Sequence, residues 1–288
     1  MRTIVLLVLA ATSVAGAADN PFEATELAPG IFMLAGSGNE FVGGGVGLLV
    51  GDEYVVLIDD VIVPTAPQLL EKVQEIAGRP VDFVINTHVH GDHVGGNEQA
   101  AKNGAIIVAH DNLRRRMEAD PKLNTGPGAL PVITFSDNVT FHVNGQQAFV
   151  FHVAQAHTDG DAVIHFRDAN VIAAGDISFR GIFPFIDLDS GGSVAGFKAA
   201  MRRVIEIADD ETKIITGHGP AGTRAGVEQD LAMLVDAEAR VKALVDQGLT
   251  ADEIVAANPL ADYHDEYNWA FITTERMTRT LIRSLTTD

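Results

Sequence analysis

Short apolar runs separated by glycines and charged turns recur along the first half of the chain and are typical of β-strands. The predicted strands lie at residues 30–34, 45–50, 54–58, 81–85 and 105–109. The first three follow one another through short turns, which predicts an antiparallel meander. Apolar positions at helical spacing predict helices over 64–76 and 110–118.

The second half of the chain repeats this plan. Strands are predicted near 139–143, 148–153, 162–166, 171–174 and 213–216, and helices over 194–207 and 224–245. Two halves that each hold strands followed by helices predict a layered α/β architecture, in which two sheets face each other with helices outside. No shift in composition marks a linker, so residues 18–288 are predicted to form one domain.

The first residues have a different character. Arg2 supplies a positive charge, residues 4–11 form a short apolar run, and Ala15-Gly16-Ala17 is a small-x-small cleavage site. This pattern predicts a secretory signal peptide over residues 1–17 and a periplasmic or secreted protein. The alternative is an N-terminal membrane anchor, which needs about 20 apolar residues, a longer run than this one.

Charge and cysteine content narrow the range of binding partners and of reaction mechanisms that we expect. The chain has 39 acidic and 20 basic residues, a formal net charge of −19, and no cysteine. Because such a surface repels nucleic acid and anionic lipid, we expect a small-molecule substrate, no nucleic acid and no membrane binding after signal removal. Without cysteine, neither disulfides nor a thiol nucleophile are available. No particular oligomeric state is predicted.

The sequence His88-Val89-His90-Gly91-Asp92-His93 places three imidazoles and a carboxylate within one short segment. Imidazole is the commonest protein ligand of Zn²⁺, and Asp supplies a charged oxygen ligand. The segment follows the predicted strand at 81–85, so its side chains are expected at the carboxyl edge of a sheet, where binding sites are commonly built. The alternative, a solvated loop rich in histidine, does not account for the spacing.

Three further candidate ligands come directly after predicted strands. His157, Asp176 and His218 each lie close to a glycine, which allows the backbone to turn sharply. Strand ends at one edge of a sheet converge in space. We therefore expect these side chains to join the His88–His93 segment.

These motifs, with Asp59 in Leu57-Ile58-Asp59, occur in the order found in the metallo-β-lactamase superfamily, which the whole mature chain resembles. The resemblance implies a four-layer αβ/βα sandwich with two divalent metal ions. Zn²⁺ is the first choice for these ions, although Fe or Mn suits the same ligands. It assigns His88, His90 and His157 to one ion and Asp92, His93 and His218 to the other. Asp176 would lie between the two ions, and Asp59 would orient the ligands without binding metal.

Such a site suits hydrolysis. Two ions about 3.5 to 4 Å apart share a hydroxide, lower its pKa and polarise the oxygen of the electrophile. Asp92 is expected both to ligate metal and to orient this nucleophile as a catalytic residue. The sequence also lacks a Gly-x-Ser-x-Gly nucleophile motif, which leaves water activated by metal as the attacker.

Several substrates fit this chemistry: amides, esters and lactones, β-lactams among them. By this resemblance, Asp176 occupies the position at which one lactamase subclass has Cys. A bridging Asp together with His93 is more typical of the sites of glyoxalase II thioesterases, lactonases and phosphodiesterases. A periplasmic metal-binding protein without catalysis is the alternative from another class. A di-iron redox protein of related fold would carry a carboxylate at position 90, where this chain has His90.

Two residues are candidates for substrate contact. Phe41 lies in a glycine-rich segment, residues 36–45, which is expected to form a hairpin near the site with this ring as an apolar cover. Arg180 comes four residues after Asp176 and could bind a substrate carboxylate with both guanidinium nitrogens.

Overall fold

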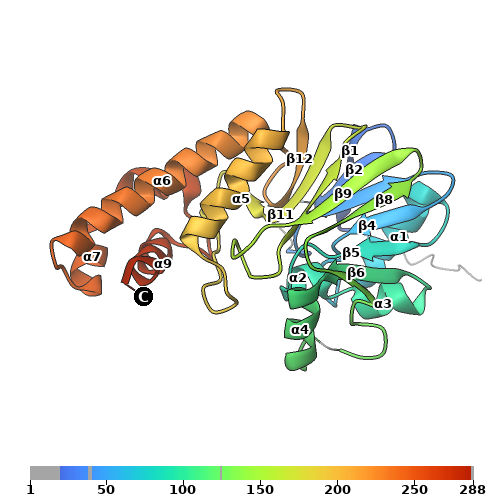
Figure 1. Ribbon diagram of the computed structural model, residues 1–288, viewed down its shortest axis with the longest axis horizontal. Helices are drawn as coiled ribbons and strands as arrows, with labels where there is room; N and C mark the ends of the chain where they lie inside the picture. The colour runs from blue at the N-terminus through green and yellow to red at the C-terminus, as the bar shows by residue number, and fades with distance from the viewer. Residues whose placement is uncertain (1–19, 38–40, 124, 287–288) are drawn as a thin grey trace, which may run out of the picture.

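Two β-sheets face each other across a shared apolar core, and helices cover their outer faces (Figure 1). This computed structural model describes residues 20–37, 41–123 and 125–286. The predicted signal peptide, residues 1–17, lies outside the described residues. The α/β class and the four-layer αβ/βα arrangement predicted from the sequence are confirmed.

The first sheet has seven strands in the order β1-β2-β3-β4-β5-β6-β7. They are β1 (Phe22–Ala28), β2 (Ile31–Gly36), β3 (Val46–Val50), β4 (Val55–Ile58), β5 (Phe83–Ile85), β6 (Ile106–His110) and β7 (Ile133–Phe135). β1 to β4 form the expected antiparallel meander, and β4 to β7 run parallel. The sequence analysis missed β1, because this edge strand is mostly exposed and carries Glu and Thr at positions where a buried strand would be apolar.

The second sheet has six strands in the order β13-β12-β11-β10-β9-β8. They are β8 (Asn138–Val143), β9 (Gln146–His152), β10 (Ala162–Phe166), β11 (Val171–Phe179), β12 (Lys213–His218) and β13 (Gly222–Thr223). β11 is buried along its whole length, and it pairs in parallel with β12. Asp176 and His218 therefore lie on neighbouring strands.

Helices cover the outer faces of the two sheets. They are α1 (Ala66–Ala77), α2 (Gly91–Val94), α3 (Asn97–Lys102), α4 (Asp111–Ala119), α5 (Val194–Ile207), α6 (Arg224–Asp246), α7 (Ala251–Ala257), α8 (His264–Tyr267), α9 (Thr274–Thr286) and the 3₁₀ helix η1 (Ala261–Tyr263). Helices of the first half cover the first sheet, α5 and the start of α6 cover the second sheet, and the remaining helices pack beside them. Within the described part of the chain, no helix is long and apolar enough to span a membrane.

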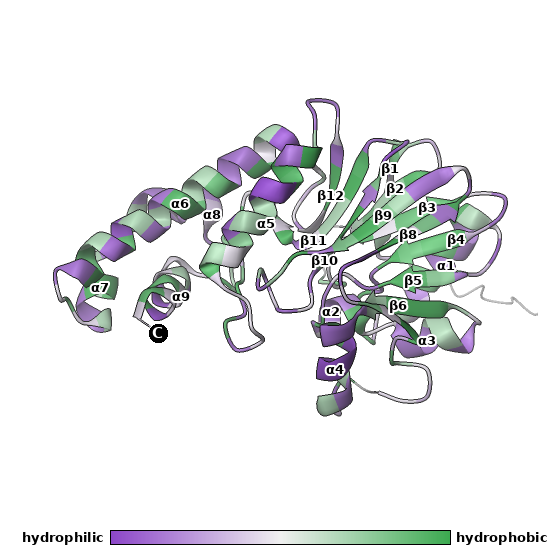
Figure 2. Cartoon of the chain, viewed as in Figure 1, coloured by the Kyte–Doolittle hydropathy of each residue, from purple (hydrophilic) through white to green (hydrophobic). Residues whose placement is uncertain are grey.

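Three apolar layers hold the sandwich together. Alternate residues of facing strands, such as Ile31 and Phe166, form the layer between the sheets. Leu69 and Val73 of α1 pack on the outer face of the first sheet, and Phe197 of α5 packs on the second. Figure 2 shows this division, with apolar strands in the middle and a largely hydrophilic α4. Each such buried side chain contributes about 1.5–3 kcal/mol to stability.

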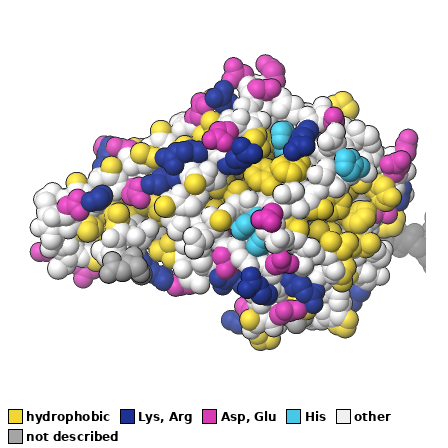
Figure 3. Space-filling view, in the orientation of Figure 1, with side chains coloured by type: hydrophobic (Ala, Val, Ile, Leu, Met, Phe, Trp, Pro, Cys, Tyr) yellow, Lys and Arg dark blue, Asp and Glu magenta, His cyan; other side chains and the backbone are white. Residues whose placement is uncertain are grey.

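The C-terminal helices form an extension beside the second sheet. α6 projects away from the sheets, and α7 and α9 pack along it (Figure 1). The end of α8 lies against the sandwich, where the backbone N–H of Phe183 donates to the carbonyl of Tyr267 at 2.8 Å, and the connection to α9 follows from there. This contact places residues 268–273 beside the sheet edge where the predicted ligands lie. On the face seen in Figure 3, basic side chains gather over α4 and α5, next to acidic ones.

Candidate metal centre

The seven predicted ligands converge at one edge of the sandwich. Four come from the segment that follows β5 and forms α2, one from the loop after β9, one from β11 and one from the end of β12. These seven are His88, His90, Asp92, His93, His157, Asp176 and His218. Strand ends thus bring together side chains that lie up to 130 positions apart in sequence.

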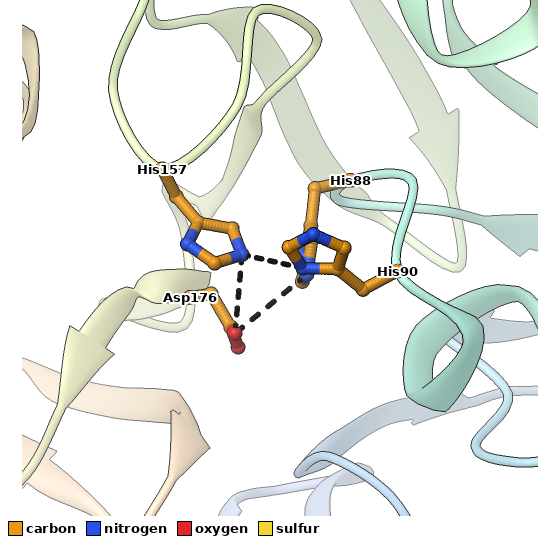
Figure 4. Close-up of side chains that lie close together, drawn as sticks. All are labelled: His88, His90, His157 and Asp176. Carbon is orange, nitrogen blue, oxygen red and sulfur yellow. Dashed lines mark hydrogen bonds and ion pairs between the residues drawn. The ribbon is translucent and has the colours of Figure 1, made fainter. Parts of the chain in front are cut away.

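His88, His90, His157 and Asp176 form the first group, with one donor atom of each within 4.8 Å of the others. Figure 4 shows these side chains pointing toward one another. Nε2 of His157 lies 2.8 Å from Nδ1 of His90 and 3.4 Å from Oδ2 of Asp176. Nε2 of His88 lies 3.6 Å from the same oxygen. Three imidazoles and one carboxylate at this spacing match a tetrahedral donor set.

Asp92, His93 and His218 form the second group. Nε2 of His218 is 3.4 Å from Oδ2 of Asp92, and Nε2 of His93 is 3.8 Å from it. Asp176 also faces this group, with Oδ1 at 3.1 Å from His93 and Oδ2 at 3.5 Å from His218. Asp176 is therefore placed between the groups, where a carboxylate can contact two ions.

Buried atoms without hydrogen-bond partners show what this site is suited to hold. Nε2 of His88, Nε2 of His93 and Oδ1 of Asp176 are fully buried and make no well-formed hydrogen bond, although the last two atoms lie 3.1 Å apart. Leaving such atoms unpaired costs about 1–3 kcal/mol each. All three face the centre of the cluster, so cations there would satisfy them. The donor set fits two divalent metal ions.

Asp59 fixes the rings of two ligands from behind. Its Oδ2 lies 2.8 Å from Nδ1 of His93 and accepts a hydrogen bond from the Thr87 hydroxyl at 2.7 Å. Since that hydroxyl has used its proton, it accepts from Nδ1 of His88, 3.0 Å away. Both imidazoles thus turn Nε2 inward. Although Asp59 lies close enough to count among possible ligands, its oxygens are already engaged, and it orients the ligands.

The loop between β11 and α5 orients the other two imidazoles of the first group. Nε2 of His90 pairs with Oδ2 of Asp187 at 2.9 Å, so Nδ1 is the atom that faces the cluster. Nδ1 of His157 lies 2.7 Å from the carbonyl oxygen of Phe185. Four of the five histidines therefore have their second ring nitrogen fixed by an outer partner, the usual arrangement around a bound metal.

Two glycines leave room for the cluster. A Cβ on Gly217 would overlap Oδ1 of Asp176, and one on Gly44 would overlap the ring of His93. The backbone N–H of Gly45 also donates to the carbonyl of Gly217 at 2.6 Å. The glycine-rich segment is thus held directly against the second group of ligands.

The charges of the cluster redistribute protons among its members. Burial raises the pKa of Asp176, but the surrounding histidines, His218 and His93 first, outweigh this effect and hold it well below its usual value. Burial opposes protonation of His218, yet Asp176 and Asp92 raise its pKa to about 9. Burial lowers the pKa of His157 to about 3. Without metal, protons therefore reside on the second group, where cations would otherwise balance the carboxylates.

A largely apolar cavity of about 890 Å³ opens onto both groups. His90, Asp92, Asp176 and His218 line it. Its walls are made mainly of aromatic and aliphatic side chains: Phe41, Ile62, Val63, Pro64, Phe179, Phe185, Trp269, Ala270 and Phe271. Phe41, which is 61% exposed, stacks parallel to the His218 ring at 6.5 Å. The structure thus places Phe41 at the cavity, where the sequence analysis expected a cover.

The sequence profile of the Metallo-beta-lactamase superfamily matches residues 41–218, which include all seven ligands. The chain belongs to the metallo-beta-lactamase superfamily. It is a metal-dependent hydrolase of that superfamily, as the similar curated proteins also indicate.

Two curated relatives match most of this chain. The "Probable metallo-hydrolase YqgX" of Bacillus subtilis is 25% identical over 198 residues, which are 64% of this chain and 92% of the relative. A hydroxyacylglutathione hydrolase of Methylococcus capsulatus is 26% identical over 225 residues, 73% of this chain and 80% of the relative.

Two solved structures share the fold. A metallo-beta-lactamase from Pontibacter korlensis superposes with a TM-score of 0.65 at 20% identity, over 75% of this chain and 99% of its own. A double mutant of the sec-alkyl sulfatase PisA1 gives 0.71 at 14% identity, over 92% of this chain and half of its own. At these identities the likeness concerns the fold alone.

The structure places Arg180 away from the substrate contact that the sequence analysis predicted for it. Its guanidinium pairs with Oδ1 of Asp230 on α6 at 3.0 Å and donates to Oε1 of Gln229 at 3.1 Å. The cavity lining does not include it. The predicted substrate contact therefore finds no support in the geometry, because a buried carboxylate on α6 engages this cation.

Sequence reasoning missed Asp187 and the aromatic residues of the C-terminal extension. Asp187 orients His90 from 97 positions away, and nothing near it in sequence marks it as a partner of metal ligands. Trp269 carried a signal, since it is the only tryptophan of the chain. An amphipathic ring of this kind is enriched at binding surfaces.

Proposed function

We propose that this chain is an exported hydrolase that uses two divalent metal ions, most simply Zn²⁺, to cleave carboxylic esters, thioesters or lactones. The observation that carries this proposal is the convergence of seven donor side chains, three of which turn a buried atom without a hydrogen bond toward one centre. Imidazole and carboxylate donors in these proportions suit zinc. The signal-peptide pattern at residues 1–17 supports export to the periplasm or the medium.

The residues of the cavity have distinct tasks in such a reaction. Two divalent ions, when bound, lower the pKa of water and polarise the carbonyl oxygen of the substrate. Asp92 remains ionised because His93 and His218 outweigh its burial and lower its pKa, so its carboxylate can accept a hydrogen bond from the attacking water. The water oxygen bonds to the carbonyl carbon, and the bond from that carbon to the leaving oxygen or sulfur breaks. One proton of the water passes to the leaving group.

The relatives and the cavity favour these substrates over β-lactams. Several curated relatives are hydroxyacylglutathione hydrolases, which supports thioester cleavage. A β-lactam antibiotic carries a carboxylate beside its ring, and among the described residues that line the cavity there is no Lys or Arg to pair with it. We therefore rank β-lactams and phosphodiesters behind carboxylic esters, thioesters and lactones.

Metal analysis and a substrate panel test the proposal together. The mature protein should contain two metal ions per chain and should hydrolyse at least one ester, thioester or lactone. Chelation should abolish turnover, and zinc should restore it. Nitrocefin and a phosphodiester in the same panel test the lower-ranked substrates. Tight metal binding with no turnover on any substrate would instead identify a metal-binding protein without catalysis.

Matched histidine variants connect turnover to the site. His218→Asn removes a donor of the second group, whereas His142→Asn changes an exposed histidine on β8. The first should lose about 100-fold or more in kcat/KM and part of its bound metal. The second should match the parent protein. Equal activity in both variants would rule out the assigned ligand set.

A further inference from the structure

An arc of aromatic rings connects the two groups of metal ligands. Phe185 stacks on His90 with ring centroids 5.5 Å apart and meets Phe271 edge-on at 5.3 Å. Phe271 contacts Trp269 at 5.6 Å, and Trp269 contacts His218 at 6.0 Å. The arc therefore begins at a ligand of the first group and ends at a ligand of the second.

Two of the three rings between the ligands come from the C-terminal extension. Trp269 and Phe271 lie outside residues 41–218, which match the superfamily profile. The segment that carries them is the connection between α8 and α9. The metal ligands and this wall thus belong to different parts of the chain. Substitutions in the wall can therefore change the cavity without changing the ligands.

The arc is held in place before any substrate binds. The guanidinium of Arg276 on α9 lies 4.2 Å from the Phe271 ring and 5.2 Å from the Phe185 ring, and it donates to the Phe271 carbonyl at 2.9 Å. Nε1 of Trp269, the only polar side-chain atom of that residue, donates to the carbonyl of Phe183 at 2.9 Å. Trp269 therefore offers only its apolar ring surface to the cavity.

Charge sets a second condition on what this wall accepts. None of the described residues lining the cavity is Lys or Arg, and the two carboxylates there belong to the metal ligands Asp92 and Asp176. A negative group extending from the reacting carbonyl toward Phe271 would meet no cation among the side chains that line the cavity, because Arg276 lies against the Phe271 ring and outside the lining. Losing water there without such a partner is unfavourable. An aromatic or bulky apolar group in that position would stack on the rings.

We propose that Trp269 and Phe271 determine specificity and select substrates whose acyl group is uncharged and aromatic or bulky and apolar. This inference rests on the proposed hydrolysis of esters, thioesters or lactones. It disfavours substrates whose acyl group carries a negative charge, such as succinyl esters and thioesters.

Matched acyl groups test this selection in the zinc-loaded protein. We compare methyl 3-phenylpropanoate, methyl propanoate and the monoanion of monomethyl succinate, together with their S-methyl thioesters. The phenylpropanoyl compounds should exceed the succinyl compounds by about 30-fold or more in kcat/KM. Equal kcat/KM for the phenylpropanoyl and succinyl compounds would overturn the inference and leave the proposed hydrolysis intact.

Variants of Phe271 assign the preference to the wall. Phe271→Ala should lower kcat/KM for the phenylpropanoyl compounds about tenfold and leave the propanoyl compounds within about twofold. Phe271→Lys should raise kcat/KM for the succinyl compounds about tenfold by supplying a cation. Val132→Ala, at an apolar side chain that is 69% exposed and lies outside the cavity lining, is the matched control. If Phe271→Lys and the parent protein discriminate equally, the wall does not select substrates.

Fluorescence provides a test that does not depend on turnover. Trp269 is the only tryptophan of the chain and lines the cavity, so its emission reports on occupancy. The neutral ketone 4-phenyl-2-butanone and the anion levulinate share a methyl ketone and a two-carbon spacer, and neither can be hydrolysed. The neutral ketone should quench the emission at a concentration at least about tenfold lower. If levulinate instead quenches at the lower concentration, the inference is refuted, whether or not the protein hydrolyses an ester, thioester or lactone. Absence of hydrolysis would refute the proposed function separately.

Discussion

Oδ2 of Asp187 lies 2.9 Å from Nε2 of His90, while Nδ1 of the same ring lies 2.8 Å from Nε2 of His157. Backbone N–H groups of Asp189 and Ser190 donate to the other carboxylate oxygen of Asp187. This carboxylate is thus fixed by its own loop and fixes in turn the orientation of one metal ligand. Such partners raise the basicity of a ligating imidazole and hold its ring in place.

We expect Asp187→Ala to weaken metal binding by about 10- to 100-fold, because His90 would lose its orienting partner. Competition with a zinc chelator measures this change directly. Asp189→Ala is the matched control, since Asp189 lies in the same loop but pairs with Arg283 at the surface. Asp187→Asn should restore part of the affinity, as its amide oxygen can still accept from Nε2. Equal affinities in the Asp187→Ala and Asp189→Ala proteins would contradict the assigned role.

Gly217 lies so close to Asp176 that a methyl group in its place would displace the carboxylate. Gly217→Ala should therefore lose at least one metal ion per chain and reduce kcat/KM by about 100-fold or more. Gly91→Ala is a stringent control, because Gly91 lies within the ligand segment but a Cβ there would meet only Leu123, at an ordinary 3.7 Å. Metal analysis of both folded proteins decides the outcome. Two ions bound to Gly217→Ala would show that the carboxylate can move without cost.

Arg180 and Asp230 should prove important for stability and not for substrate binding. Burial raises the pKa of Asp230 to about 6, although Arg180 opposes this effect. Arg180→Ala leaves that carboxyl group without its cation and should lower the free energy of unfolding by about 2 kcal/mol. KM should stay within about twofold. Adding Asp230→Asn should recover part of the stability, and urea denaturation measures each protein. A tenfold higher KM for Arg180→Ala would restore the predicted substrate contact.

The sequence was informative wherever a local pattern carried the chemistry. The spacing from His88 to His93 indicates metal by itself, and His157, Asp176 and His218 each follow an apolar run and lie close to a glycine. Because strand ends share an edge of a sheet, predicting the strands was enough to predict that these ligands converge. The layered fold followed from the same runs, since the apolar strands need helices on both outer faces.

The sequence was uninformative where partners are set by packing between distant segments. Asp230 lies 50 positions from Arg180, and only the packing of α6 brings them together. The cavity wall depends on the return of residues 268–273 from the helical extension, and no periodicity predicts where such a connection lies. Edge strand β1 was missed because its polar positions face solvent and leave little of the apolar pattern that marks a strand.

Metal binding should stabilise the protein more at high pH than at neutral pH. In the metal-free protein the pKa of His218 is about 9, above its usual 6.5, because Asp176 and Asp92 outweigh its burial. A raised pKa in the folded state means that the protonated ring contributes stability below about pH 6.5, and that this contribution is lost as the pH rises through about 9. A metal ion requires the neutral ring and displaces the same proton.

Calorimetry of chelator-treated and zinc-loaded protein at pH 7, 8 and 9, with free zinc held constant by a chelator buffer, tests this coupling. The Tm of the metal-free protein should fall over this range, and the rise in Tm on adding zinc should grow. His218→Asn should flatten the fall, whereas His142→Asn, whose ring is exposed, should reproduce the parent curve. A zinc-dependent rise that is the same at pH 7 and pH 9 would mean that proton and metal do not compete at His218. Competition at this ring is expected because its Nε2 is the atom that faces both carboxylates.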